Sequence, residues 1–498
     1  MKTSWPARPV IYEINTWVWL SDLSRQQKRA ITLGTVPAEQ WDAIASLNVD
    51  AVWLMGVWER SPEGIRIANA NAGLQADFRR ALPDYTPTDN VGSAYCVHNY
   101  VVDEHLGGPE GLVVARQMLA QRGLRLILDF VPNHLATDHP WVFEHPDFFV
   151  QGTREDLAQA PGAFFEVGGT VIANGRDPYF PPWQDVAQLN AFSSPLRQAI
   201  IEIVNSIAKQ CDGMRCDMTM LLLNNIFKQT WGGHVGDPLP EEYWREVISA
   251  VRFQHPRVLF IAEAYWDLEW ELLQLGFDYC YDKRLYDRLE RDNAESIRLH
   301  LTAGLDYQDR LVRFIENHDE PRAAATFTPE RERVAALTMM TLPGAKLLYE
   351  GQIEGRRIRP PVFLSRRPLE PIDSDLQTFY RQLLAAVKDA GLSQAAWQLC
   401  ERTGWPDNSS YLNLVAWRWG QGDARYLVVV NLSQYQSQAR IQLPWDNLAS
   451  RTWHLTDVLS GDMFNREGDE LHTTGLYVDL SAWRFNFLRF QADQRNVV

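Results

Sequence analysis

The chain has 498 residues, enough for one large domain with a smaller domain beside it. Its 46% hydrophobic and 22% charged residues are typical of a folded globular protein. The 48 basic and 63 acidic side chains leave a formal net charge of -15, so we expect no nucleic-acid partner, because phosphate binding needs clustered Lys and Arg.

The N-terminal residues, MKTSWPARPV, contain two prolines and no apolar core, so they do not predict a signal peptide. Nowhere does an uninterrupted apolar stretch reach the roughly 20 residues that span a bilayer, which predicts no membrane partner. The five cysteines are an odd number and lack the CxxC spacing of metal sites. We therefore expect buried thiols in a cytoplasmic protein.

Eight short apolar runs rich in β-branched residues recur along most of the chain, with amphipathic stretches between most of them. They predict strands at VIYEIN (10–15), DAVWLM (50–55), LRLILDF (124–130), DGMRCDM (212–218), VLFIAEA (258–264), FDYCYD (277–282), LVRFIEN (311–317) and AKLLYE (345–350). Helices are predicted at 37–48, 109–122, 194–210, 240–254, 330–340 and 374–390. Strands that alternate with helices in this way predict an α/β fold, a (β/α)8 TIM barrel.

The domain organisation follows from two long connections and a change of pattern near the C-terminus. The connection after the second strand, at about 56–108, and the one after the third are too long for a minimal barrel, and such insertions usually build binding sites. We expect the barrel at 1–134 and 191–395, with an inserted subdomain at 135–190. Short alternating runs beyond this point predict a C-terminal antiparallel β-sandwich domain at 396–498.

Three tryptophans of this last region, Trp417, Trp419 and Trp453, have two interpretations. They could stack on sugar rings, since aromatic faces pack against the C–H faces of neutral sugars. Buried core positions are the more common use of tryptophan in an alternating β pattern, and the region has no cluster of acids. We expect core positions and no catalytic residues here.

Polar side chains gather where four of the predicted strands end. The third strand ends in DFVPNH, the fourth in DGMRCDM, the fifth at Glu263, and the seventh continues into ENHD. Arg215 and Asp217, two positions apart in a strand, would point to the same side, and lone buried charges are costly. Each group alone has a structural explanation, such as a strand-end cap or an ion pair. Together they indicate acid–base or nucleophilic chemistry at the C-terminal end of a barrel.

The ordered segments DFVPNH, GMRCDM, IAEA and ENHD resemble the four signature segments of the α-amylase family of glycoside hydrolases. Further similarities are GSAYCVHNYVVDEHLGG after the second strand, WQDVAQLN before the fourth and LLYEGQ at the eighth. The resemblance covers residues 8–395 and implies a retaining enzyme acting on α-glucosidic bonds, either a hydrolase or a transglycosidase. The implied substrate is a neutral α-linked oligosaccharide or glucan.

The resemblance also implies three catalytic residues, with Arg215 beside them among the substrate-binding residues. Asp217 matches the nucleophile, Glu263 the general acid and base, and Asp319 the third carboxylate, which helps to distort and hold the sugar. Arg215 matches the arginine that keeps the nucleophile ionised and oriented. Such chemistry needs one protonated and one ionised carboxyl group about 5 Å apart, because the leaving oxygen takes a proton while an anion faces the positive centre.

Three further residues match sugar-binding positions of the family. His134 and His318 match histidines that hydrogen-bond sugar hydroxyls, and Tyr95 matches a tyrosine that stacks under the same ring. Many members carry a Lys-His pair three and four residues beyond the nucleophile, where this chain has Met220 and Leu221. We expect these two side chains either to form an apolar leaving-group subsite that favours transfer to sugar acceptors, or to turn into the core.

We expect no cofactor, and calcium is the open alternative because Asn133 matches a calcium ligand of some family members and a structural residue of others. Two further readings of the function stay open. One is a catalytically inactive relative that binds a carbohydrate or a partner, although Asp217, Glu263 and Asp319 are all present. The other is an unrelated metal-dependent hydrolase with His134 and His318 as ligands, although no third histidine stands at a ligand-like strand end.

Overall fold

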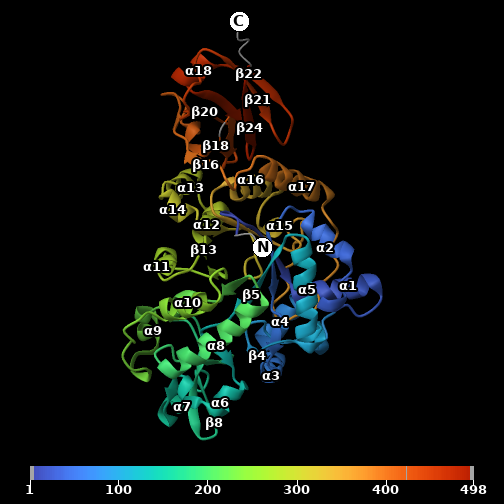
Figure 1. The fold of residues 1–498 in the computed structure, drawn as a ribbon, viewed down its shortest axis with the longest axis vertical. Coiled ribbons are helices and arrows are strands. Elements are labelled where there is room, and N and C mark those ends of the chain that lie inside the picture. The colour runs from blue at the N-terminus through green and yellow to red at the C-terminus, as the bar shows by residue number, and fades with distance from the viewer. Residues whose placement is uncertain (1–4, 422, 494–498) are drawn as a thin grey trace.

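The computed structural model describes residues 5–421 and 423–493, and its centre is a closed barrel of eight parallel strands (Figure 1). Around the barrel the strands follow the order β1-β15-β14-β13-β12-β11-β5-β2. They are β1 (Val10–Asn15), β2 (Ala51–Met55), β5 (Arg125–Phe130), β11 (Gly213–Cys216), β12 (Leu259–Ala262), β13 (Tyr279–Tyr281), β14 (Leu311–Arg313) and β15 (Ala345–Tyr349). Each strand lies within one of the eight apolar runs, so the predicted barrel is confirmed.

Helices cover the outside of the barrel, as its buried parallel strands require. All six predicted helices are present, as α2 (Ala38–Ala45), α5 (Gly108–Gln121), α8 (Ser194–Gln210), α10 (Tyr243–Gln254), α16 (Pro329–Thr341) and α17 (Ser374–Asp389). Helices without a sequence prediction include α1 (Thr16–Gln27), which directly follows β1 and begins where the Asn15 side chain accepts a hydrogen bond from the Val18 amide at 3.3 Å.

The inside of the barrel is filled by large side chains of alternate strand positions and by Phe314, which directly follows β14. Trp53, Ile127, Tyr281 and Phe314 belong to this inner cluster, and each is at most 2% exposed. Apolar side chains at the other strand positions, such as Val52 and Leu128, pack outward in a separate and larger apolar cluster. Polar groups at the C-terminal end of the barrel therefore stand on a rigid aromatic base.

The two long connections form small structures of their own beside the C-terminal ends of the strands. After β2, β3 (Trp58–Arg60) pairs with β4 (Val97–Val102), and α3 (Pro62–Ala70) and α4 (Ala72–Ala81) lie between them in sequence. After β5, an antiparallel sheet contains β6 (His134–Ala136), β7 (Gln151–Gly152), β8 (Phe164–Val167), β9 (Thr170–Gly175) and β10 (Trp183–Gln188). In Figure 1 this sheet lies at the opposite end of the molecule from the C-terminal domain.

The C-terminal domain is built from two antiparallel sheets, as predicted. The larger has the order β16-β18-β19-β24-β21-β22 and the smaller β17-β20-β23. The strands are β16 (Ala396–Leu399), β17 (Arg402–Thr403), β18 (Leu414–Gln421), β19 (Ala424–Asn431), β20 (Ser437–Ile441), β21 (Thr452–Asp457), β22 (Met463–Glu467), β23 (Leu476–Leu480) and β24 (Phe485–Ala492).

Trp417, Trp419 and Trp453, the tryptophans of this domain for which core positions were predicted, are core residues, which confirms the prediction. Trp417 and Trp419 are fully buried and Trp453 is 3% exposed. The indole N–H groups of Trp417 and Trp419 both donate to the carbonyl of Thr341 at the end of α16, at 3.0 and 2.7 Å. These two side chains therefore join the larger sheet to the barrel.

The structure describes all five cysteines. Each of them is buried, and none forms a disulfide bond. Within residues 5–421 and 423–493, no helix has both the length and the apolar composition needed to cross a bilayer.

Candidate active site

Asp217 and Glu263 directly follow two neighbouring strands of the barrel. β11 ends at Cys216 and β12 at Ala262, and these two residues lie opposite each other in the parallel register. The amide of Glu263 donates to the Cys216 carbonyl at 3.0 Å, and the amide of Asp217 donates to the Phe130 carbonyl at 2.9 Å. Asp217 and Glu263 therefore lie at equivalent positions, one residue beyond the C-terminal ends of two paired strands. Asp319 comes from the loop after β14.

The fourth strand is shorter than the sequence predicted. It covers Gly213–Cys216 instead of 212–218, and the chain turns at Met218, whose φ of 42° is in the left-handed region. The alternation of side chains along a strand therefore sets the direction of the Arg215 side chain but not that of Asp217, which lies beyond the strand. The predicted pairing of the two side chains is nevertheless present, because Arg215 Nη1 lies 2.8 Å from Asp217 Oδ1.

Arg215 is the centre of the site and is only 1% exposed. Besides its contact with Asp217, its Nη2 atom lies 2.7 Å from Glu263 Oε2. Asp129 and Asp319 place carboxylate oxygens 3.8 and 3.9 Å from the same guanidinium. Since a buried charge is tolerated only when it is paired, four carboxylates around one arginine hold this group firmly in place.

Aromatic rings surround the same guanidinium. Its carbon lies 5.3 Å from the ring centroid of Trp53, 5.1 Å from that of Tyr95 and 5.8 Å from that of Tyr281. The faces of aromatic rings attract cations and exclude water. The charges of the site therefore act in an environment of low polarity, where each charge strongly influences its neighbours.

The pKa values of Glu263 and Asp217 are shifted by this environment. Burial, together with the negative charges of Asp217 and Asp319, raises the pKa of Glu263 to about 7, although Arg215 opposes the rise. Burial also raises the pKa of Asp217 above its usual value, and Arg215 opposes this through its charge and its hydrogen bond. Near neutral pH, Glu263 can therefore carry a proton while an ionised Asp217 is paired with Arg215.

Asp319 belongs to a second charged group, with His318 and Glu13. His318 Nδ1 lies 2.5 Å from Glu13 Oε1, and its Nε2 lies 3.0 Å from Asp319 Oδ2. Burial lowers the pKa of His318, but Asp319 and Glu13 outweigh it and raise the pKa to about 10. Partial burial raises the pKa of Asp319, but the charges of His318 and Arg215 outweigh it and lower the pKa to about 2. Asp319 is thus ionised, and its side chain, 40% exposed, is the most accessible of the three carboxylates.

Tyr95 and His134 lie against this group. The Tyr95 hydroxyl is 2.6 Å from His318 Nε2, and the two rings stack with centroids 5.4 Å apart. His134 Nε2 is 3.2 Å from the Tyr95 carbonyl, and burial lowers the pKa of His134 to about 4, so this imidazole is neutral. All seven site residues predicted from the sequence thus lie in one neighbourhood at the C-terminal end of the barrel.

Glu13 and Tyr265 also contact residues of the site, and neither was predicted. Glu13 is fully buried and binds His318, and its signal was an acidic residue inside the apolar run VIYEIN. Tyr265 donates a hydrogen bond from its hydroxyl to Glu263 Oε1 at 2.8 Å. No local pattern distinguishes that tyrosine from others in the chain.

The prediction that Met220 and Leu221 form an apolar subsite is wrong. Met220 is fully buried and belongs to the main apolar cluster, and Leu221 is 3% exposed. Both lie in the short turn Thr219–Leu222, which follows the left-handed Met218 and directs them into the protein. Their other predicted position, in the core, is the one observed.

The residue that matches a calcium ligand is bound by other groups of the protein. The side chain of Asn133, the position that matches a calcium ligand, exchanges two hydrogen bonds with the Gln188 amide, at 3.2 and 3.0 Å. Among the residues that the structure describes, no group of three or more His, Cys, Asp or Glu side chains is arranged to hold a metal. Both ring nitrogens of His318 have protein partners, which disfavours the reading of a metal-dependent hydrolase.

Comparison with known proteins identifies similar sequences over most of the chain. The family model described as alpha amylase, catalytic domain, matches residues 37–419. Alpha-amylase MalA of Haloarcula japonica is 24% identical over 404 residues, which cover 78% of this chain and 49% of that protein. Probable oligo-1,6-glucosidase 2 of Bacillus subtilis is 21% identical over 491 residues, 83% of this chain and 79% of that protein. The chain thus spans about half of MalA.

Solved structures share the fold over almost the whole chain. A maltogenic alpha-amylase, AmyB, from Thermotoga neapolitana superposes with a TM-score of 0.68 at 17% identity, covering 97% of this chain and 99% of that one. An alpha-amylase from Geobacillus thermoleovorans, complexed with acarbose, gives 0.67 at 16% identity, covering 99% and 100%. At this level of identity the likeness concerns the fold.

Proposed function

This chain belongs to the α-amylase family and is an enzyme of that family, and from this premise we propose that it is a retaining α-glycosidase. Its proposed substrates are glucans or oligosaccharides with α-glucosidic bonds, cleaved through a covalent intermediate on Asp217. The observation that carries the proposal is the contact of one buried arginine, Arg215, with both Asp217 and Glu263, at 2.8 and 2.7 Å.

In the first step Asp217 is the nucleophile and Glu263 the acid. A carboxylate oxygen of Asp217 attacks the anomeric carbon, while Glu263 gives its proton to the glycosidic oxygen, and the bond between carbon and that oxygen breaks. The products are a glucosyl ester on Asp217 and a free sugar alcohol. The raised pKa of Glu263, about 7, supports its role as a proton donor near neutral pH.

In the second step Glu263, now ionised, takes a proton from water, and the water oxygen attacks the anomeric carbon. The ester bond breaks and Asp217 is released as a carboxylate. Asp319 stays ionised throughout because His318 and Arg215 hold its pKa low, so it can accept hydrogen bonds from sugar hydroxyls. Tyr95 and His134 would lie beside the same sugar.

The configuration of the product tests this mechanism. Two displacements at one carbon restore the starting configuration, so the first product should be the α-anomer. Proton NMR of the anomeric signals, recorded before mutarotation, measures this. An initial β-product would contradict the covalent intermediate.

The same incubation separates hydrolysis from transfer to a sugar. The exposed Tyr179 (66%) packs at 5.0 Å against Trp266, three residues beyond Glu263, so this aromatic pair could bind an acceptor sugar. Transfer would produce chains longer than a maltotriose donor at high concentration. An absence of any turnover on a panel of α-glucosides would instead support the inactive carbohydrate-binding relative.

The activity should depend on pH as a bell-shaped curve. Above about pH 7 Glu263 loses the proton that it must donate, and at low pH Asp217 gains a proton and loses its nucleophilic charge. The two carboxyl groups are coupled, so the limbs of kcat/KM report values of the pair. Glu269→Gln is a matched control, because burial also raises the pKa of Glu269 to about 7. The Glu269→Gln variant should keep the alkaline limb of the profile. If the alkaline limb disappeared in this variant, the limb could not be assigned to Glu263.

A further inference from the structure

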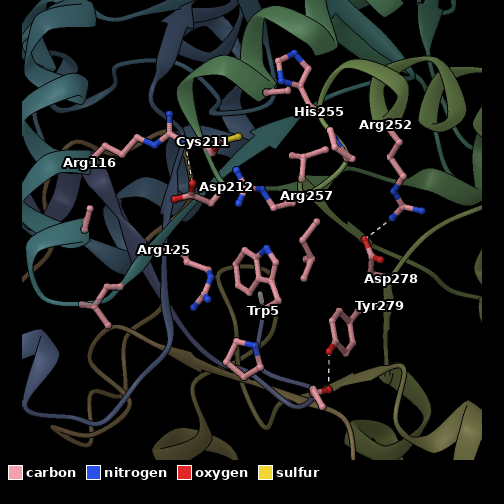
Figure 2. A pocket seen from close by; sticks show the side chains of 18 of the residues that line it. Trp5, Arg116, Arg125, Cys211, Asp212, Arg252, His255, Arg257, Asp278 and Tyr279 are labelled. Atoms are coloured by element: carbon pink, nitrogen blue, oxygen red, sulfur yellow. Dashed lines mark hydrogen bonds and ion pairs between the residues drawn. The ribbon is translucent and has the colours of Figure 1, made fainter. Parts of the chain in front are cut away.

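A cavity of about 1320 Å³ lies at the N-terminal end of the barrel, opposite the candidate active site (Figure 2). Its lining includes Asp212, which precedes β11, and Leu259, which begins β12. Asp217 and Glu263 follow the same two strands at their other ends. With a rise of about 3.3 Å per residue, the five steps from Asp212 to Asp217 separate the two places by roughly 16 Å. The cavity is therefore a separate place on the molecule.

The charged side chains of the cavity are mostly arginines. Three aspartates line it, together with five arginines: Arg116, Arg125, Arg252, Arg257 and Arg310. The lining thus carries two more positive than negative side chains, in a chain whose formal charge is -15. Such a local excess attracts anions against the overall charge of the protein.

The aspartates fix arginines in position and are themselves neutralised. Asp212 lies 2.8 Å from Arg116, and Asp278 lies 2.6 Å from Arg252. The third, Asp309, lies 2.6 Å from Arg8, which is outside the lining. Each carboxylate is therefore paired with an arginine, which reduces its repulsion of an incoming anion.

Arg310 is oriented by hydrogen bonds to neutral groups, which leave its positive charge in place. Its guanidinium donates to the backbone carbonyls of Leu273, Phe277 and Asp278, and a carbonyl is a neutral acceptor. A guanidinium held in this way is preorganised, so little conformational entropy is lost when it binds an anion.

An aromatic floor accompanies these charges. Figure 2 shows Trp5 in the middle of the cavity, with Arg125 and Arg257 on different sides of it. The Arg125 guanidinium lies 4.9 Å from the Trp5 ring centroid. The Tyr279 hydroxyl donates to the Ala7 carbonyl at 2.7 Å, which ties the segment after Trp5 to the barrel. The indole also lies close to the backbone of β11, since a Cβ atom on Gly213 would be 3.3 Å from Trp5 Cζ2.

We propose that this cavity is a binding site for a small phosphorylated metabolite that contains a ring. Arginine matches a phosphate group in charge and in its paired N–H donors, so the arginine cluster would take the phosphate. The Trp5 face and the apolar floor would take the sugar or base ring. The volume exceeds the roughly 300–1,000 Å³ of ordinary ligand pockets, so both parts fit together.

Calorimetric titration of the full chain tests the proposal with four probes: glucose 6-phosphate, AMP, inorganic phosphate and glucose. Comparing glucose 6-phosphate with AMP shows whether the site prefers a sugar ring or a base ring. Inorganic phosphate measures binding of the anion without a ring, and glucose measures binding of a ring without phosphate. We expect at least one ring-bearing phosphate to bind more tightly than both inorganic phosphate and glucose.

Two variants locate that binding. Arg257→Glu reverses an exposed charge of the lining and should weaken the ring-bearing phosphate by about 10-fold or more, the loss expected for a charge-assisted contact. Arg154→Glu reverses an arginine with a 78% exposed side chain in the inserted subdomain and should leave the affinity unchanged. Binding that survives Arg257→Glu, or equal affinity for glucose and the phosphorylated probes, would overturn the site. Equal affinity for inorganic phosphate and both ring-bearing probes would overturn the assignment to a ring-bearing ligand.

These measurements do not depend on the glycosidase mechanism. Asp217→Asn should bind the phosphorylated probe as tightly as the unaltered protein, because Asp217 lies at the other end of β11. Loss of binding in that variant would place the ligand in the candidate active site and overturn the proposal.

Discussion

Replacing Asp217 by asparagine is expected to lower kcat by about 10³-fold or more on every α-glucoside substrate. The amide of asparagine is a poor nucleophile, so no group remains to form the covalent bond to the anomeric carbon. Steady-state kinetics of the purified variant measure the loss. A variant that keeps a tenth of the original rate would exclude Asp217 as the nucleophile.

The fold should tolerate this change. The asparagine side chain would be neutral and of the same shape, and its amide oxygen could still accept the hydrogen bond that Arg215 donates to Asp217 at 2.8 Å. Arg215 also retains Glu263, Asp129 and Asp319 as neighbouring carboxylates. The thermal midpoint should therefore change by only a few degrees, about 1 kcal/mol in a large domain. Asp84→Asn, at a side chain that is 75% exposed, is the matched control for both measurements.

A covalent adduct gives a second measurement of the same step. A substrate with a slow second step should add one glucosyl unit to the peptide that contains Asp217, as detected by mass spectrometry of the quenched enzyme. The Asp217→Asn variant should show no adduct. An adduct on a different peptide would show that a residue other than Asp217 is the nucleophile.

The barrel could be predicted from the sequence because its signals are local. Each of the eight strands is a short apolar run, and the acidic or polar residues at their ends stand out against that background. The chain order of the runs then sets which ends meet, since all eight strands are parallel. Arg215, Asp217, Glu263 and Asp319 were predictable for this reason.

Other features depend on contacts that no local pattern contains. Glu13 and His318 are 305 residues apart in sequence, and only the closure of the barrel, in which β1 pairs with β15 and β15 pairs with β14, brings them to 2.5 Å. The sequence left two positions open for Met220 because a motif gives a position in the chain but no side-chain direction, and the left-handed Met218 turns the following residues inward. The basic cavity gathers the Trp5 segment and the N-terminal ends of several strands, so it was invisible in the sequence.

The variant Glu263→Gln is expected to lose about 10²- to 10⁴-fold in kcat/KM on maltooligosaccharides, the usual contribution of a positioned proton donor. The loss should be much smaller on aryl α-glucosides with acidic phenols, because such leaving groups depart without a proton. The alkaline limb of the pH profile should also disappear on these activated substrates, since no group with a pKa of about 7 then limits the first step. Glu269→Gln, which removes another buried carboxyl of raised pKa, serves again as the control.

An added nucleophile makes the assignment of Glu263 more specific. In Glu263→Ala the glucosyl ester on Asp217 still forms from an aryl glucoside, but no base activates water for the second step. Azide needs no base and fits the space left by the removed carboxyl, so it should restore turnover and give the α-glucosyl azide, the product of two displacements. Asp217→Ala with azide should instead give the β-glucosyl azide, because azide then replaces the enzyme nucleophile and acts in a single displacement. The product configurations are read by proton NMR. A β-azide from Glu263→Ala, or equal losses of Glu263→Gln on aryl glucosides and maltooligosaccharides, would show that Glu263 is not the acid and base.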